Sequence, residues 1–137
     1  MHTANYYGTI IEVAEDCPVE KAEIPRLKKS EKTIAIMQYE FLAGHPYQYT
    51  SDEIIFGVYA AKNNIGQAQL QSEREKFFSK GQPCLRSSPL VKRYGWGIHS
   101  DREGKVAIYA VESGEYKKFC KDKTVQHVKG MKSKRLK

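Results

Sequence analysis

The chain has 137 residues and a mass of 15.7 kDa, a size that suits one domain able to bury a core without disulfides or a metal. Hydrophobic residues make up 40% and charged residues 28%, which is typical of a soluble globular protein. Its apolar runs are far shorter than the ~18 residues of a membrane span, so we expect no membrane insertion.

The formal net charge of +7 is concentrated near the C-terminus. Residues 117–137 hold nine Lys or Arg and one acidic residue, whereas residues 1–116 hold fourteen Lys or Arg and fifteen acidic residues. The body is therefore close to neutral and lacks the broad basic face of many nucleic-acid-binding domains. We predict a single domain over residues 1–129, followed by a basic, mobile tail over residues 130–137.

The three cysteines, Cys17, Cys84 and Cys120, are odd in number and widely spaced, which is not the pattern of a disulfide framework. None has a second cysteine or a histidine at the spacing of a zinc site, so we expect no metal and no cofactor. The N-terminal MHTANYYGTIIEV lacks the basic region, the apolar stretch and the small-residue cleavage site of a secretory signal. These features together predict a cytoplasmic protein.

The first third of the chain predicts a strand and a helix. Residues 5–14 are rich in β-branched and aromatic side chains and predict a strand. Residues 15–30, with two prolines and mixed charges, predict an exposed connection. A helix is expected to begin at Ser30 and to end near Ala43, because apolar residues recur there at helical spacing before a glycine and a proline.

The middle of the chain predicts two further helices from their first turns. Thr50 and Glu53 have the spacing of a capping box and predict a helix over residues 51–63. Ser72 and Glu75 repeat that spacing and predict a shorter helix that ends before a glycine and a proline.

The last third predicts a hairpin, a helix and an edge strand. Residues 94–99 and 105–111 alternate as strands across a glycine-containing loop. Ser113 is a candidate cap for a last helix, and residues 124–128 predict a final strand. We therefore expect an α+β fold, in which a small antiparallel sheet, formed by the N-terminal strand and the C-terminal hairpin, is packed by three to four helices.

Three long stretches of the sequence are familiar: NYYGTIIEVAEDCPVEKAEIP, YEFLAGHPYQYTSDEIIF and FFSKGQPCLRSSPLVKRYGWGIHSDREGKVAIYAVES. They resemble a family of small bacterial proteins that is catalogued only as a domain of unknown function. The resemblance covers nearly the whole chain and is most specific from Phe77 to Ser113, which includes GQPCLRSSPLVKRYGWGIH. It implies one stand-alone domain, and it carries over no activity because the family has none assigned.

Residues 82–101 concentrate the chemistry-bearing side chains. Alternation along 94–99 predicts two different faces, with Tyr94, Trp96 and Ile98 on one and Gly95, Gly97 and His99 on the other. Two glycines on one face leave a bare strip of backbone, which often marks close approach by a ligand or another part of the chain. Either this strip is a shallow groove with His99 at its rim, or an aromatic side chain such as Tyr109 covers it.

The favoured hypothesis is a non-enzymatic binding module for an anionic or aromatic partner, nucleic acid included, around residues 82–99. Guanidinium and ammonium groups recognise phosphate or carboxylate, aromatic rings stack on flat ligands, and glycines admit close approach. The predicted ligand-binding residues are Arg86, Lys92, Arg93, Tyr94, Gly95, Trp96, Gly97 and His99.

Two alternatives of other classes stay open. Cys84 is a candidate nucleophile because cationic residues follow it, with His99 as the base if the fold brings the two together. Buried cysteines more often serve only packing, so we favour this small enzyme less. The other alternative is a protein–protein interaction domain. The sequence specifies neither the partner nor the oligomeric state.

Overall fold

The structure is a computed structural model that describes residues 2–27 and 31–133. The strands of these residues are β1 Thr9–Glu12, β2 Trp96–Ser100, β3 Val106–Ala110 and β4 Gln126–Lys129. The α-helices are α1 Ile34–Leu42, α2 Ser51–Lys62, α3 Leu70–Phe77, α4 Pro89–Lys92 and α5 Gly114–Lys121. Two short 3-10 helices, η1 Gln67–Gln69 and η2 Leu85–Ser87, precede α3 and α4.

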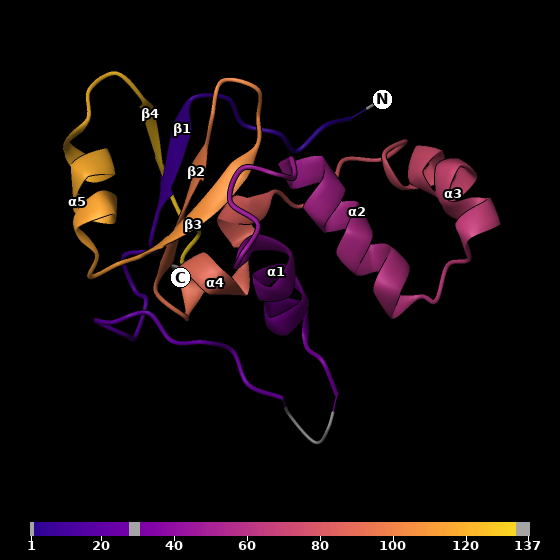
Figure 1. Ribbon diagram of the computed structural model, residues 1–137, viewed down its shortest axis with the longest axis horizontal. Coiled ribbons are helices and arrows are strands. Elements are labelled where there is room, and N and C mark those ends of the chain that lie inside the picture. The colour runs from indigo at the N-terminus through magenta and orange to yellow at the C-terminus, as the bar shows by residue number, and fades with distance from the viewer. Residues whose placement is uncertain (1, 28–30, 134–137) are drawn as a thin grey trace, which may run out of the picture.

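The elements form one α+β domain, as the sequence predicts, with helices on both faces of a single sheet (Figure 1). The strand order is β3-β2-β1-β4. Helix α5 lies against one face of the sheet, α1 and α4 pack on the other, and α2 packs on α1. The sheet is mixed and not antiparallel throughout, because β4 runs parallel to β1 while β2 pairs antiparallel with both its neighbours.

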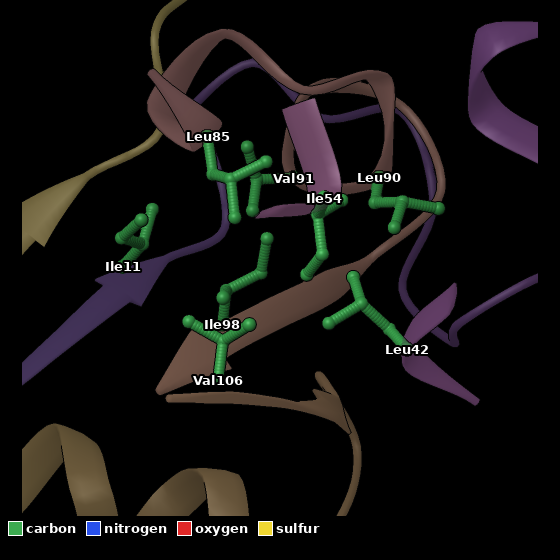
Figure 2. Close-up of a cluster of buried hydrophobic side chains, with 8 residues drawn as sticks. All are labelled: Ile11, Leu42, Ile54, Leu85, Leu90, Val91, Ile98 and Val106. Atoms are coloured by element: carbon green, nitrogen blue, oxygen red, sulfur yellow. The ribbon is translucent and has the colours of Figure 1, made fainter. Parts of the chain in front are cut away.

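The hydrophobic core lies between the sheet and the helices α1, α2 and α4 (Figure 2). Ile11, Ile98 and Ile108 stand opposite one another on β1, β2 and β3, so one face of three strands presents aliphatic side chains. Leu42 and Ile54 meet them from α1 and α2 and are almost fully buried. This alternation is the period-two pattern of half-buried strands.

Two of the predicted helix caps are confirmed. The Thr50 hydroxyl accepts a hydrogen bond from the Glu53 amide at 3.2 Å, and the Glu53 carboxylate accepts one from the Thr50 amide at 3.0 Å, so the capping box opens α2. The Ser113 hydroxyl accepts from the Tyr116 amide at 3.1 Å and caps α5.

The other two helix starts differ from the expectation. The predicted Ser72 cap is wrong, because the 3-10 turn η1 leads directly into α3 at Leu70 and the Ser72 hydroxyl donates to the Gln69 carbonyl instead. Helix α1 is capped by Thr33, whose hydroxyl accepts from the Ile36 amide, while the predicted start at Ser30 lies outside the described residues. In the described part of the chain the longest helix, α2, has 12 residues, and no helix is long and apolar enough to cross a membrane.

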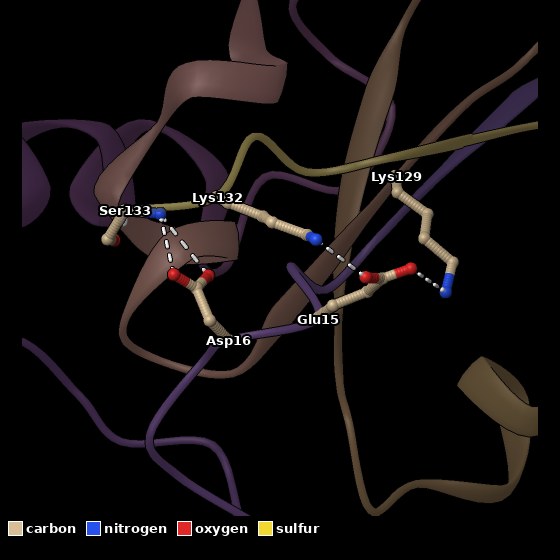
Figure 3. Close-up of polar contacts among 5 residues, drawn as sticks. All are labelled: Glu15, Asp16, Lys129, Lys132 and Ser133. Carbon is tan, nitrogen blue, oxygen red and sulfur yellow. Dashed lines mark hydrogen bonds and ion pairs between the residues drawn. The ribbon is translucent and has the colours of Figure 1, made fainter. Parts of the chain in front are cut away.

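The beginning of the predicted tail lies along the body of the domain (Figure 3). The Glu15 carboxylate pairs with the ammonium groups of Lys129 at 3.2 Å and Lys132 at 3.1 Å. The Ser133 amide donates to both carboxylate oxygens of Asp16, at 2.9 and 3.2 Å. Residues 134–137 of the predicted tail lie outside the described residues.

Candidate functional site

The segment 82–99 is divided by the fold between two environments. Residues 82–93 run past the helices through η2 and α4, and residues 96–99 form part of the inner strand β2. Strand β2 begins at Trp96 because Gly95 adopts a φ of +78°, which ends the extended run and is a conformation that favours glycine. The predicted alternation therefore holds from Trp96 onward and does not include Tyr94.

The two glycines are covered by the protein's own chain. A Cβ placed on Gly95 would lie 2.9 Å from the Val19 side chain and 3.2 Å from the Ala22 backbone. A Cβ on Gly97 would overlap the ring of Tyr116, which projects from α5. Covering by an aromatic side chain therefore holds for Gly97, whereas Gly95 is covered by Val19 and the Ala22 backbone. The ring over Gly97 comes from α5 and not from Tyr109 on the neighbouring strand.

Trp96 packs against other segments of the protein. Its indole N–H donates to the Glu23 carbonyl at 2.8 Å, and its ring lies 5.5 Å from that of Tyr39 on α1. The indole thereby anchors the connection that precedes α1, which gives this side chain a role in packing.

His99 is buried on the α5 face of the sheet. Its ring stacks on Phe119 with a centroid distance of 4.1 Å. Its Nδ1 lies 2.9 Å from the Tyr47 hydroxyl, which in turn lies 2.7 Å from the Tyr109 hydroxyl. Burial lowers the pKa of the imidazole below its ordinary value, so the neutral form is favoured. Tyr109, Tyr47 and His99 thus form a chain of hydrogen bonds. No local sequence pattern indicates that these three side chains meet.

Cys84 lies on the other side of the sheet, among residues of α2 and the start of α4. Its Sγ lies 3.3 Å from the Tyr6 hydroxyl. Burial and this contact with Cys84 raise the pKa of Tyr6 to about 12. Across residues 2–27 and 31–133 no hydrogen bond joins Cys84 to a histidine, and the Cys84–His99 dyad is not assembled in this conformation.

Arg86 is directed to the C-terminal segment. Its Nε donates to the Lys129 carbonyl at 2.8 Å, and its own carbonyl accepts from the Met131 amide at 2.8 Å. Both contacts stabilise the path of the chain after β4. Arg86 therefore contacts the C-terminal segment, whereas Lys92 and Arg93 line a different surface.

Lys92, Arg93 and Tyr94 do come together, at a surface cavity of about 780 Å³ that we name the basic cleft. The volume lies within the range of small-molecule sites. Its lining residues come from five segments: Glu31, Lys32, Thr33, Ile34, Ala35, Lys62, Ser87, Pro89, Lys92, Arg93 and Tyr94.

Three helix ends converge on the basic cleft. Lys62 is the last residue of α2, Lys92 is the last residue of α4, and Thr33 caps the start of α1. Lysines near helix C-termini commonly offset the helix dipole, which accounts for two of the cations without any ligand. The first turn of α1 has no acidic side chain, so the positive end of its dipole also contributes to the potential of the cleft.

The cations of the cleft are incompletely neutralised. Lys32 pairs with Glu40 at 3.0 Å. Within the described ranges, no carboxylate lies within ion-pair distance of Lys62, Lys92 or Arg93. The one acidic side chain of the lining, Glu31, is exposed. An anion that enters the cleft therefore meets three cations with no partner in the described part of the chain.

Sequence reasoning missed two cations of the cleft, Lys32 and Lys62. Both are remote in sequence from residues 82–99, and Lys62 has the ordinary position of a lysine at a helix C-terminus. Only the packing of α2 against α1, and of α1 against α4, brings Lys62 near Lys92. No local sequence pattern could have predicted that Lys62 lies near Lys92.

Comparison with known proteins gives a family and no function. No curated protein and no solved structure matches the chain. A family model with the description "Family of unknown function (DUF6157)" matches residues 1–136, a range that contains every residue of the basic cleft. The chain therefore belongs to DUF6157, a family of unknown function.

Proposed function

We propose that the protein is a binding module that holds a small anionic ligand, bearing a phosphate or a carboxylate group, in the basic cleft. The observation that carries this proposal is the convergence of Lys62, Lys92 and Arg93, without carboxylate partners among the described residues, on one cavity. Ionised donors form the stronger hydrogen bonds to such groups, and the planar fork of an arginine matches their geometry. The Tyr94 ring at the cleft suits a flat part of the ligand.

A small anion is favoured over nucleic acid because the cations occupy one bounded cavity. Residues 1–116 are close to neutral in total, whereas a nucleic-acid-binding surface usually extends as a basic face or stripe. The three cysteines are free thiols, which supports the predicted cytoplasmic location.

The test is calorimetric titration with inorganic tripolyphosphate at low salt. We expect saturable one-to-one binding that weakens as salt is added, and a loss of roughly tenfold in affinity for Lys92→Gln and for Arg93→Gln, the scale of one charge-assisted contact. Lys117→Gln removes the same charge from α5, on the opposite face of the sheet, and should leave the affinity unchanged. Arg86→Gln should also bind normally, since Arg86 contacts the C-terminal segment.

The nucleic-acid alternative is tested with a labelled single-stranded oligonucleotide. If the oligonucleotide binds and the two cleft substitutions do not weaken it, the partner is a polyanion held elsewhere, for example by the C-terminal cations. Equal tripolyphosphate affinity in the wild type and the two cleft variants would exclude the proposed site.

A further inference from the structure

A second cavity adjoins the basic cleft. It has a volume of about 360 Å³, and we name it the apolar groove. Four residues line both cavities: Ile34, Lys62, Ser87 and Pro89. Because these four residues form a shared wall, one ligand can reach both spaces, and each cavity taken alone lies within the dimensions of small-molecule sites.

The walls of the apolar groove are hydrophobic. Ile55, Val58 and Tyr59 come from α2, and Phe77 comes from the end of α3. The rings of Tyr59 and Phe77 lie 4.6 Å apart, and 36% of Tyr59 is exposed. An exposed aromatic wall of this kind gains stability when an apolar group covers it.

Several uncharged polar side chains at the apolar groove already have partners within the chain. The Ser88 hydroxyl donates to the Gln38 side-chain carbonyl, and the Gln82 amide donates to the Phe77 carbonyl at 2.6 Å. A polar ligand would have to compete with these bonds, whereas an apolar one leaves them intact. The apolar groove therefore selects for hydrocarbon and aromatic surface.

We infer that the ligand is an amphipathic small molecule, with an anionic group held by Lys62, Lys92 and Arg93 and an aromatic or short aliphatic body in the apolar groove. This inference rests on the proposed function and specifies its ligand class. Lys62 joins the two parts, since it is the cation among the four residues that line both cavities.

Cys84 provides a reporter that is independent of affinity. It lines the apolar groove and is partly exposed, so a body in that groove should shield its thiol from an alkylating reagent. Cys120 lies on α5, on the other face of the sheet, and is also partly exposed. Its alkylation rate serves as the internal control.

The experiment compares two dyes that share one aromatic body, 8-anilinonaphthalene-1-sulfonate and the uncharged N-phenyl-1-naphthylamine, by fluorescence titration of the full chain. We expect the sulfonate to bind at least tenfold more tightly, and Lys62→Gln to remove most of that difference. Saturating sulfonate dye should slow iodoacetamide alkylation of Cys84 severalfold and leave Cys120 unchanged. Equal affinity for the two dyes, or an unprotected Cys84, would overturn the inference.

A variant of the apolar groove separates this inference from the proposed function. Tyr59→Ser removes an exposed ring, so the fold should persist, as circular dichroism can verify. We expect it to weaken both dyes at least fivefold and to leave tripolyphosphate binding unchanged. If tripolyphosphate binds in the basic cleft while Tyr59→Ser leaves dye binding unaltered, the amphipathic ligand is excluded and the anion site stands. If tripolyphosphate also fails to bind, both proposals fall.

Discussion

At the scale of single residues, the contact between Gly97 and Tyr116 determines how closely α5 packs on the sheet. Tyr116 is buried, and its hydroxyl accepts a hydrogen bond from the Val13 amide at 2.9 Å, so its ring has little freedom to move. Gly97 lies beneath that ring. The glycine thus permits an aromatic side chain to lie directly on the backbone of β2.

We predict that Gly97→Ala destabilises the protein by about 1–3 kcal/mol, because the added methyl group must displace a ring that is held at both ends. Gly114→Ala is the matched control, since a Cβ there has no atom within 4 Å and should change stability by less than about 0.5 kcal/mol. Urea unfolding of the two variants measures both values. A Gly97→Ala variant as stable as the wild type would show that α5 is loosely seated.

The same scale shows why the candidate site was only partly predictable. Lys92, Arg93 and Tyr94 are consecutive, so their common location followed from the sequence. Gly95 and Gly97 were compatible with a ligand groove as well as with the favoured internal packing, because glycine admits either neighbour. Lys62 could not be predicted, since only helix packing brings it to the cleft.

At the scale of elements, the two similar Ser/Thr–Glu spacings have different outcomes. Thr50 opens α2 with a complete capping box. Ser72 falls inside the first turn of α3, because the 3-10 turn before it already carries the chain into the helix. A capping-box spacing predicts a helix start only where the preceding residues are extended, as the backbone of Thr50 is.

We predict that Thr50→Ala lowers the free energy of unfolding by about 1 kcal/mol, the usual cost of a lost N-cap. Ser72→Ala should change it by less than about 0.5 kcal/mol, because this hydroxyl is exposed and bonds only to the Gln69 carbonyl. Thermal or urea unfolding of the two variants provides the comparison. Equal losses at both positions would contradict the helix starts described above.

The order of the elements was largely predictable, whereas the sheet topology was not. Hydrophobic period and turn residues gave strands at both ends of the chain and helices between them. The parallel pairing of β4 with β1 has no counterpart in local sequence, since a four-residue strand with mostly exposed side chains fits either direction. The short helix α4 was missed for a related reason: its four residues are too few for a period to appear.

At the scale of the whole molecule, two histidines near α5 respond to pH in opposite senses. His127 donates to the Glu12 carboxylate from Nδ1 at 2.9 Å and to the Asp122 carbonyl from Nε2 at 2.6 Å. The bond to Glu12, followed by that to Asp122, raises the pKa of His127. Burial lowers the pKa of His99, and Asp101 and Asp122 oppose this only in part.

The opposite pKa shifts of His127 and His99 predict that the free energy of unfolding is largest near neutral pH. The His127 contribution is complete below ~6.5, its ordinary pKa, and is lost as pH rises through the raised pKa of the folded state. The buried His99 contributes in the opposite sense: because its pKa is lowered in the folded state, the free energy of unfolding falls as pH drops below ~6.5. Glu12→Gln should remove most of the loss on the alkaline side and leave the acidic side unchanged. Urea midpoints across this range, with NMR titration of both imidazoles, provide the test.

The position of β1 in the sheet also decides when the molecule can finish folding. Its two neighbours, β2 and β4, come from the last third of the chain, so Ile10 has partners only at His99 and His127. A chain emerging from the ribosome exposes this apolar strand long before the residues of either neighbour have been synthesised. Such non-local pairing slows folding and leaves an unpaired edge open to other chains. The sheet can therefore close around β1 only after the distant segments of β2 and β4 have both been synthesised.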